Sequence, residues 1–563
     1  MSEPLLRAAS EPSSQLFLDG GDSNEVFQLD TNALRVATRV ITTAELLDLV
    51  LSFLERFDLI KTAPVSQFWL EISRGHIWRI VENAWELFGL LAPLRPSRGN
   101  HGHEFERIPS YEDWLRFQPF ASRVRRLRIE GPYDDEDCSK VVTALLSKIC
   151  LYSALASNDN LAQLSLFLHP GLEELIMYVP PNDLAGYPVE TICADIAFKA
   201  PYIRHLELVP YGCVTSLPIE MALANLLLRL ESRLTSLYLP VYGLTQTLFE
   251  AASHLQHVED IAFATTVAPM VVALYHDVLV FTPHLERNSF PALRKLSLCA
   301  SLADLKEIVS NHNFPANRLS DFLVRAVRPE TPAAVETFHA TVARECRSLT
   351  TYSLVLTAPY DEKGDNERWP ESPGPDTILG WTAFAPLADG VLRSLVSIAV
   401  AHEHAFKLTI HELADLARSL PNLEYFVCNP SPHVAGGNPP TIKLLEINIL
   451  PDCMPNVETL ELYVDASDAT VDYPRWSEKY FPRLRSLWMG ASPVNSARRM
   501  GISFFLAGLL ATGARIDTER WEIWDYAAPE SRYVSDWDRI AEDVALLMEA
   551  RAGVERTPLY PAP

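Results

Sequence analysis

The sequence predicts an α/β protein in which three short helices precede a long solenoid of strand-and-helix repeats. Two observations indicate the repeat: the pattern Leu-x-x-Leu-x-Leu recurs along the chain, and helical segments separate several of its copies. A third observation is the stretch 42–78, which turn and cap signals divide into three short helices. In such a solenoid, parallel strands line the inside of an arc and helices cover its outside.

The first of the three helices has an unusual distribution of polarity. Thr42 and Glu45 form a capping-box pattern, which predicts its start. Asp48, Ser52 and Glu55 form one narrow polar stripe, and apolar residues cover the rest. A helix that is apolar nearly all round requires burial on two sides. Its own small domain supplies one side, so we expect a partner to cover the other.

The next two helices are short and sharply bounded. Asp58 predicts the start of a brief helix, and Pro64 ends it because the residue before a proline avoids the helical region. Pro64 also suits the first turn of the third helix, and Gly75 predicts the end of that helix. The apolar face of the third helix consists of Val65, Phe68, Trp69 and Ile72. The surplus of apolar surface on these helices is typical of a protein-binding surface.

At these positions the stretch resembles an F-box domain. The matching residues are Glu45-Leu46-Leu47, Leu51-Ser52-Phe53-Leu54, Asp58-Leu59, Val65-Ser66, Phe68-Trp69 and the closing Trp78. One departure concerns Thr42-Thr43, which stand where the family usually has Leu-Pro, at the edge of the family's adaptor contact. This departure bears on adaptor affinity and not on the fold.

The resemblance implies an F-box at 39–80 that docks on a Skp-family adaptor and, through it, on a cullin. The residues that it implies for docking are Leu46, Leu47, Val50, Leu51, Leu54, Pro64, Val65 and Trp69. Some of them must form the core of the domain instead, and the sequence does not sort them. We expect a double Leu47→Asp, Leu51→Asp change to abolish adaptor binding and to leave the repeat folded.

The remaining chain divides by composition. Residues 1–38 are polar and predict a disordered leader. Apolar residues from Ile77 to Phe88 continue at helical spacing, so we assign 81–120 to a linker helix, which ends near Leu91, and a loop.

The repeat unit is often a proline followed by Leu-x-x-Leu-x-Leu. Clear copies begin at Leu172, Ile203, Leu234, Leu293, Leu423, Val457 and Leu484, and weaker copies begin at Val124, Val258, Leu349 and Leu395. The last two apolar positions of a copy lie two residues apart and therefore face the same side of a short strand. Helical patterns at Pro218–Leu230 and His411–Leu420 lie between copies.

The uneven spacing of these copies resembles the irregular leucine-rich repeats that accompany F-boxes, particularly in large fungal families. The resemblance covers 121–500, and the alternative is a non-repeating α/β domain whose strands are rich in leucine. The pattern lapses between the copies at Leu293 and Leu349, and polar loops at 359–375 and 429–440 predict surface excursions suited to binding.

Residues 501–563 predict a C-terminal cap and tail. Phe504–Leu510 has the pattern of a closing helix, and Val544–Met548 lies on a last helix. Between them we expect an aromatic cluster of Trp521, Trp524, Tyr526 and Trp537.

The overall composition narrows the class of partner. There are 72 acidic and 48 basic residues, a net charge of −24, which repels nucleic acid. The eight cysteines are scattered, which argues against a zinc site or a dense disulfide framework. The chain starts without a signal-peptide pattern and holds no apolar run of membrane-spanning length, so we expect no membrane contact and a cytoplasmic or nuclear location.

Two clusters of residues raise the question of a binding site, one for a metal and one for an anion. His402-Glu403-His404 with His411 and Glu412 suggests a metal, but neither glutamate has the helical metalloprotease frame and no third ligand is visible, so we predict no metal and no cofactor. The second cluster, Arg123, Arg125, Arg126 and Arg128, predicts a solvated strand face. The alternative is an anion-binding patch for a phosphorylated partner.

No nucleophile elbow, phosphate loop or dinucleotide fingerprint appears, so we predict no enzymatic activity. The family resemblance implies a non-catalytic substrate receptor of a Skp–cullin–F-box type ubiquitin ligase, with an unknown target on the repeat arc. The alternative is a leucine-rich-repeat scaffold or regulator with a degenerate F-box, outside any ligase. A hydrolase would require a constellation of carboxylates or histidines that the sequence does not reveal.

Overall fold

The computed structural model describes 39–82, 84–96, 103–107, 110–129, 168–179, 189–210, 217–241, 243–264, 281–357, 374–432, 439–468, 479–518 and 533–556. The chain divides into two compact units, Met1–Ile77 and Trp78–Pro563, and each is described by itself. The predicted leader at 1–38 and most of the predicted loop at 359–375 lie outside the described residues.

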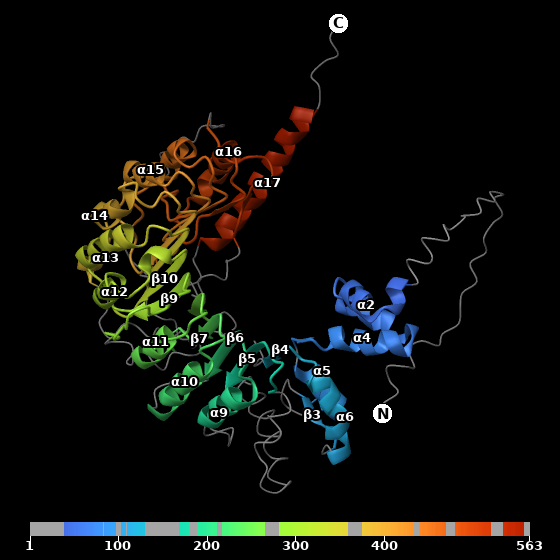
Figure 1. The fold of residues 1–563 in the computed structure, drawn as a ribbon. Coiled ribbons are helices and arrows are strands. Elements are labelled where there is room, and N and C mark those ends of the chain that lie inside the picture. The colour runs from blue at the N-terminus through green and yellow to red at the C-terminus, as the bar shows by residue number, and fades with distance from the viewer. Residues whose placement is uncertain are drawn as a thin grey trace, which may run out of the picture. The chain divides into compact units, whose positions relative to one another are not determined.

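The described part of the N-terminal unit contains a helical turn at 39–42, three short helices and one 3₁₀ turn. The helices and the 3₁₀ turn are α2 (Ala44–Leu51), α3 (Arg56–Thr62), η2 (Ala63–Val65) and α4 (Gln67–Ile77) (Figure 1). Leu47, Leu51 and Leu59 are fully buried between the helices. Leu54, Trp69, Ile72 and Ile77 pack against them as partly buried neighbours.

The predicted capping box at Thr42 is wrong. Residues 39–42 are already helical, and the hydroxyls of Thr42 and Thr43 donate back to the carbonyl of Arg39 at 3.3 and 2.7 Å. The N-cap of α2 is Thr43, and no side chain caps it. A hydroxyl that bonds to the preceding turn is not available to cap the following one.

The other boundary predictions for this unit have mixed outcomes. Pro64 lies in η2, directly after the end of α3, as expected of a helix stop, but it is not in the first turn of α4. Asp58 does not start α3; it lies in the first turn and its carboxylate pairs with Lys61 at 3.2 Å. Gly75 does not end α4, which continues to Ile77.

The second unit is an open α/β solenoid of the leucine-rich-repeat type. Its described strands form one fourteen-stranded parallel sheet, in which each strand pairs with the next along the chain, and a two-stranded antiparallel ribbon lies apart from it. The strands of the large sheet are β1 (Ile80–Val81), β4 (Arg126–Ile129), β5 (Glu174–Val179), β6 (His205–Pro210), β7 (Ser236–Leu239), β8 (Asp260–Phe263), β9 (Lys295–Ala300), β10 (Asp321–Ala326), β11 (Thr351–Leu356), β12 (Ser397–His402), β13 (Tyr425–Cys428), β14 (Thr459–Leu462), β15 (Ser486–Trp488) and β16 (Arg515–Ile516). The ribbon is β2 (Leu94–Pro96) with β3 (His103–Phe105).

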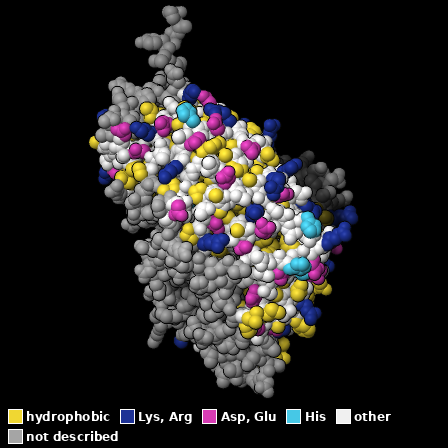
Figure 2. All heavy atoms as spheres, turned by 90° about the vertical axis from the view of Figure 1, so that its left-hand side faces the viewer, with side chains coloured by type: hydrophobic (Ala, Val, Ile, Leu, Met, Phe, Trp, Pro, Cys, Tyr) yellow, Lys and Arg dark blue, Asp and Glu magenta, His cyan; other side chains and the backbone are white. Residues whose placement is uncertain are grey.

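Helices connect the strands and cover one face of this sheet (Figure 1). They are α5 (Ala84–Leu91), α6 (Tyr111–Ala121), α9 (Val189–Lys199), α10 (Leu217–Arg229), α11 (Gln246–Ser253), α12 (Leu302–Val309), α13 (Pro332–Glu345), α14 (Trp381–Phe384), α15 (Ile410–Ser419), α16 (Arg499–Leu509) and α17 (Val534–Arg556). On the helical face, acidic, basic and hydrophobic side chains are mixed at the surface (Figure 2).

One ladder of apolar side chains explains why the strands stack in register. The second leucine of each repeat pairs with its equivalent in the next strand, for example Leu206 with Leu237 and Phe426 with Leu460. These side chains are buried and belong to one continuous core under the helices. Because side chains alternate along a strand, the neighbouring positions face the opposite side of the sheet, which we call the inner face.

The predicted helices at Pro218–Leu230 and His411–Leu420 correspond to α10 and α15, and the closing helices correspond to α16 and α17. Of the predicted aromatic cluster, Trp521, Trp524 and Tyr526 lie outside the described residues. Trp537 is buried on α17, and its indole N–H donates to the carbonyl of Ser492 at 2.9 Å.

Two predictions about the repeat are wrong. The pattern does not lapse after Leu293, because β10 carries Leu319-x-x-Phe322-x-Val324, in which phenylalanine and valine replace leucine at buried positions. The expected continuous helix from Ile77 to Leu91 is interrupted by β1, which pairs with β4. Val81 thereby joins the core of the solenoid, and the linker becomes its first strand and helix.

Candidate partner-binding surfaces

Helix α2 of the N-terminal unit presents two different apolar stripes. Leu47 and Leu51 are 0% exposed and form the core with Leu59. On a neighbouring stripe, Leu46 is 40% exposed, Val50 is 44% exposed and Phe53, just beyond the helix, is 81% exposed. Residues four and three apart lie on the same side of a helix, so this second stripe is continuous.

The N-terminal unit exposes further large apolar side chains besides this stripe. Its exposed large apolar side chains are Ile41, Leu46, Leu49, Val50, Phe53, Phe57, Ile60, Val65 and Phe68. We call this set the N-terminal apolar surface. A concentration of this kind marks a site for a protein partner.

Two polar side chains on and next to α2 make contacts within the unit. The carboxylate of Asp48 lies 2.8 Å from Nε2 of His76, which joins α2 to α4. Ser52 donates to the carbonyl of Leu49 at 2.7 Å.

The structure divides the eight residues predicted for docking. Leu46, Val50, Pro64 and Val65 are exposed, and Leu54 and Trp69 are half-buried. Leu47 and Leu51 belong to the core that some of the eight were expected to form, so a double Asp change there would disrupt the unit itself. Leu49, Phe53, Phe57, Ile60 and Phe68 were not among the eight, and they are exposed as well. The only signal for Leu49 and Phe53 was the nearly all-round apolar character of the helix.

The inner face of the solenoid carries different types of polar side chain in its first and second halves. Along one register line the residues are Arg126, Glu174, His205, Ser236, Asp260, Lys295, Asp321, Thr351, Ser397, Tyr425, Thr459, Ser486 and Arg515. Most residues up to Asp321 are ionisable, whereas the line from Thr351 to Ser486 carries hydroxyls only. The first half therefore favours a charged partner surface, and the second half favours a neutral one.

Several charges in the first half are already paired. The guanidinium of Arg126 bonds to both carboxylate oxygens of Glu174, with Nη2 at 2.9 Å from Oε1. The hydroxyl of Tyr238 donates to Asp260 at 2.7 Å, and the ring of Tyr238 lies against that of His205 at 4.8 Å. Burial lowers the pKa of His205 from its ordinary value. Of the four clustered arginines, Arg126 thus has a structural carboxylate partner, and Arg125 donates to the carbonyl of Ser122 at 3.2 Å.

A buried carboxylate lies on β14 in the second half. Glu461 is 5% exposed, and within the described residues its Oε2 has no hydrogen-bond partner. Burial, with a smaller contribution from the charge of Asp517, raises the pKa of Glu461 to about 7.

The residues of the histidine cluster form hydrogen bonds within the fold. The amide of His402 donates to Oδ1 of Asn429 at 3.0 Å, and Nδ2 of Asn429 donates to the carbonyl of His404 at 2.7 Å. Glu412 completes a capping box with Thr409 at the start of α15. Within the described residues, no three His, Cys, Asp or Glu side chains are placed to hold a metal ion. No described helix has the length and apolar character needed to cross a membrane.

Comparisons with known proteins add little to this geometry. No protein-family model matches the sequence, and no curated protein matches it. Among solved structures, the leucine-rich repeat-containing protein LegL7 from Legionella pneumophila is 12% identical over 69% of this chain and 95% of its own, with a TM-score of 0.30. The complex of Rad7 and Elc1 in yeast is 16% identical over 58% of this chain and 87% of the matched chain, with a TM-score of 0.21. Such low values carry no argument, so the assignment of the repeat fold depends on the sheet itself.

Proposed function

We propose that this chain is a substrate-receptor subunit of a Skp–cullin–F-box type ubiquitin ligase. The N-terminal unit would bind a Skp-family adaptor, and through it a cullin, and the solenoid would hold a target protein. The F-box-like residue pattern and the N-terminal apolar surface support this proposal together. The observation that carries it is the exposed stripe of Leu46, Val50 and Phe53 beside the buried stripe of the same helix.

A receptor of this kind performs no bond chemistry of its own. It holds a target lysine near a ubiquitin-loaded enzyme, which raises the effective concentration of the two reactants. The solenoid suits this role because its inner face is a long surface built from many strands. The charged first half and the neutral second half supply different contacts for one extended target.

The test is co-expression of the full chain with a Skp-family adaptor, followed by size-exclusion chromatography. We expect the wild-type chain to elute as a one-to-one complex and the double variant Leu46→Asp, Val50→Asp to elute apart from the adaptor. A matched control is Met221→Asp with Leu228→Asp on α10, where both side chains are 45% exposed, like those of the docking stripe. The control should keep the complex.

Failure of the wild-type chain to bind an adaptor that still binds another F-box protein would overturn the proposal. The second candidate function, a leucine-rich-repeat scaffold outside any ligase, would then be the better supported one. The observation that favours it is the helical turn at 39–42, where Thr42 and Thr43 bond back to Arg39 in place of the family's Leu-Pro entry.

A further inference from the structure

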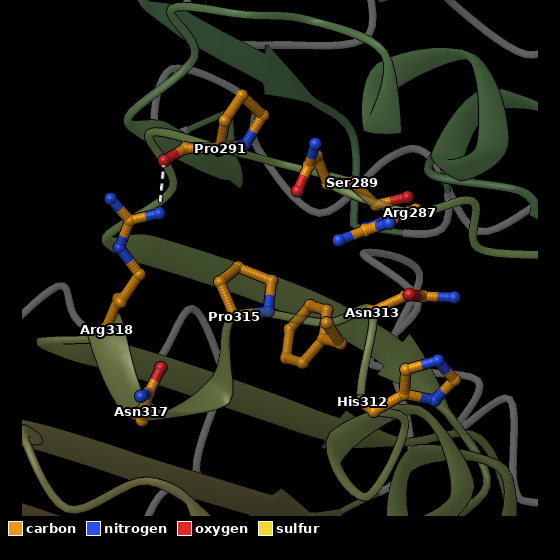
Figure 3. Close-up of a pocket in the computed structure, with 10 residues that line it drawn as sticks. Arg287, Ser289, Pro291, His312, Asn313, Pro315, Asn317 and Arg318 are labelled. Carbon is orange, nitrogen blue, oxygen red and sulfur yellow. Dashed lines mark hydrogen bonds between the residues drawn. The ribbon is translucent and has the colours of Figure 1, made fainter.

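A hollow of about 730 Å³ lies between two loops on the solenoid, and it has the size of a small-ligand site. One loop, 285–294, leads into β9, and the other, 310–320, leads into β10 (Figure 3). Its lining residues are Arg287, Asn288, Ser289, Pro291, His312, Asn313, Phe314, Pro315, Asn317 and Arg318.

The lining is cationic and rich in hydrogen-bond donors. It holds two arginines, a histidine and three asparagines, and no acidic residue. This composition stands out in a chain with 72 acidic and 48 basic residues. In a protein whose net charge repels anions, such a hollow is a local site where an anion is attracted.

Its two arginines keep donors available. Figure 3 shows Arg318 and Arg287 on opposite sides of Pro315. Arg318 donates through Nη1 to the carbonyl of Pro291, which leaves most of its five N–H groups unused. Within the described residues the side chains of Arg287 and His312 make no hydrogen bond or ion pair.

The loops that form the hollow are fixed in shape. Nδ2 of Asn313 donates to the carbonyl of Leu285 at 2.9 Å, which ties the loops at a second point besides Arg318 and Pro291. Phe290 has a φ of 52° and Asn288 a φ of 66°, a left-handed conformation that is unfavourable for a bulky side chain such as that of Phe290. The amide of Phe290 donates to Ser253 at 2.9 Å, and its buried ring packs on Phe249 at 4.8 Å. A strained loop held by its surroundings is typical of a pre-organised binding site.

We propose that this hollow binds a phosphate monoester, with Arg287 and Arg318 gripping the dianion from two sides. A phosphate offers three acceptor oxygens in a tetrahedral arrangement, so two guanidinium groups on opposite sides both find an oxygen. A carboxylate has two oxygens in one plane and is satisfied by a single guanidinium fork. The phosphate belongs to a phosphorylated side chain of a protein or to a small phosphorylated molecule. This proposal is independent of adaptor binding.

Calorimetric titration of the full chain at physiological salt tests the proposal. The probes are inorganic phosphate, N-acetyl-phosphoserine amide and, as a dicarboxylate, succinate. We expect both phosphates to bind and succinate to bind about tenfold more weakly or not at all. Tighter binding of the phosphoserine probe would assign the site to phosphorylated proteins, and tighter binding of inorganic phosphate would assign it to small anions.

Arg287→Gln is the decisive variant, since Arg287 is exposed and its side chain makes no hydrogen bond or ion pair with the described residues. It should weaken phosphate binding about tenfold or more, while its thermal unfolding stays unchanged. The matched control is Arg229→Gln, which removes the same charge from an exposed position in the last turn of α10. The proposal is overturned if phosphate does not bind, if succinate binds equally well, or if Arg287→Gln and Arg229→Gln bind phosphate alike.

Discussion

The N-terminal unit and the solenoid handle their apolar side chains in opposite ways. In the solenoid, one continuous core runs from Val81 to Met548. In the described part of the N-terminal unit, the apolar core cluster consists of three buried leucines, while nine large apolar side chains between Ile41 and Phe68 are exposed. The thirteen other exposed large apolar side chains of the described residues are spread from Ile80 to Leu546.

The two units differ in their helix caps as well. In the solenoid, Ser110, Thr245, Ser301, Thr331 and Thr409 each accept a backbone N–H at a helix start. In the N-terminal unit, α2 and α3 have no side-chain cap, whereas the hydroxyl of Ser66 accepts the amide N–H of Trp69 at 3.2 Å at the start of α4. Local signals therefore support these five solenoid helices and α4, whereas α2 and α3 depend on packing.

The solenoid therefore buries its apolar side chains within its own repeats, whereas the N-terminal unit leaves many of its apolar side chains exposed. Units of about 40 residues bury too little surface to be stable without additional support. A partner that binds the folded form stabilises it by mass action. The comparison leads to four predictions.

The largest expected effect is the difference in stability between a substitution on the buried stripe of α2 and one on its exposed stripe. Leu51→Asp places a charge in the small core and should cost about 4 kcal/mol, enough to unfold the N-terminal unit. Val50→Asp, one residue away on the exposed stripe, should change the free energy of unfolding by less than about 0.5 kcal/mol. Hydrogen exchange of the amides at 39–77 measures both. Equal protection in the two variants would contradict the division into stripes.

The next effect concerns Glu461 in the solenoid. Its pKa is about 7 in the folded state and 4.5 as the ordinary value, so the folded state binds the proton more tightly. The stabilisation from this proton is fully present below pH 4.5 and is lost as the pH rises through 7, a total of about 3 kcal/mol. Glu461→Gln should therefore be more stable than the wild type at pH 8 and much closer to it at pH 5. Urea unfolding of both proteins at the two pH values measures this, and a difference that does not change with pH would refute it.

A smaller effect is expected at Asn429, whose φ is 46° and whose amide holds His402 and His404. Asn429→Ala loses two hydrogen bonds and forces alanine into a left-handed conformation, at a cost of about 2 to 3 kcal/mol. Asn429→Gly loses the same bonds without the conformational cost, so it should fall between alanine and the wild type. Thermal unfolding ranks the three, and a glycine variant less stable than the alanine variant would argue against this account.

The smallest expected effect on stability concerns the side-chain caps of the helices. Thr409→Ala removes a capping box from α15 and should cost about 1 kcal/mol of the free energy of unfolding. Thr43→Ala should cost only a few tenths of a kcal/mol, because its hydroxyl does not cap α2. Chemical denaturation followed at each unit provides the comparison. A larger loss for Thr43→Ala would mean that its bond to Arg39 stabilises the unit more than a cap does.

The repeat architecture could be predicted from local patterns in the chain. Spacings within a strand or helix are local, so Leu-x-x-Leu-x-Leu fixes which side chains share a face wherever the strand lies. Seven clear copies and four weaker ones therefore predicted eleven strands of the sheet. The strand at Phe322 was missed because an aromatic residue stands in for leucine, and β1 and β16 were missed because two residues are too short for a pattern.

Which apolar and charged side chains remain exposed depends on how the elements pack in three dimensions. Leu46 and Leu47 are equally apolar in sequence, and packing of α3 and α4 against one side of α2 buries Leu47 and leaves Leu46 exposed. Arg287 and Arg318 line the same hollow because successive repeats stack, although they are far apart in the chain. Burial and such juxtapositions are properties of the assembled elements, and no local spacing encodes them.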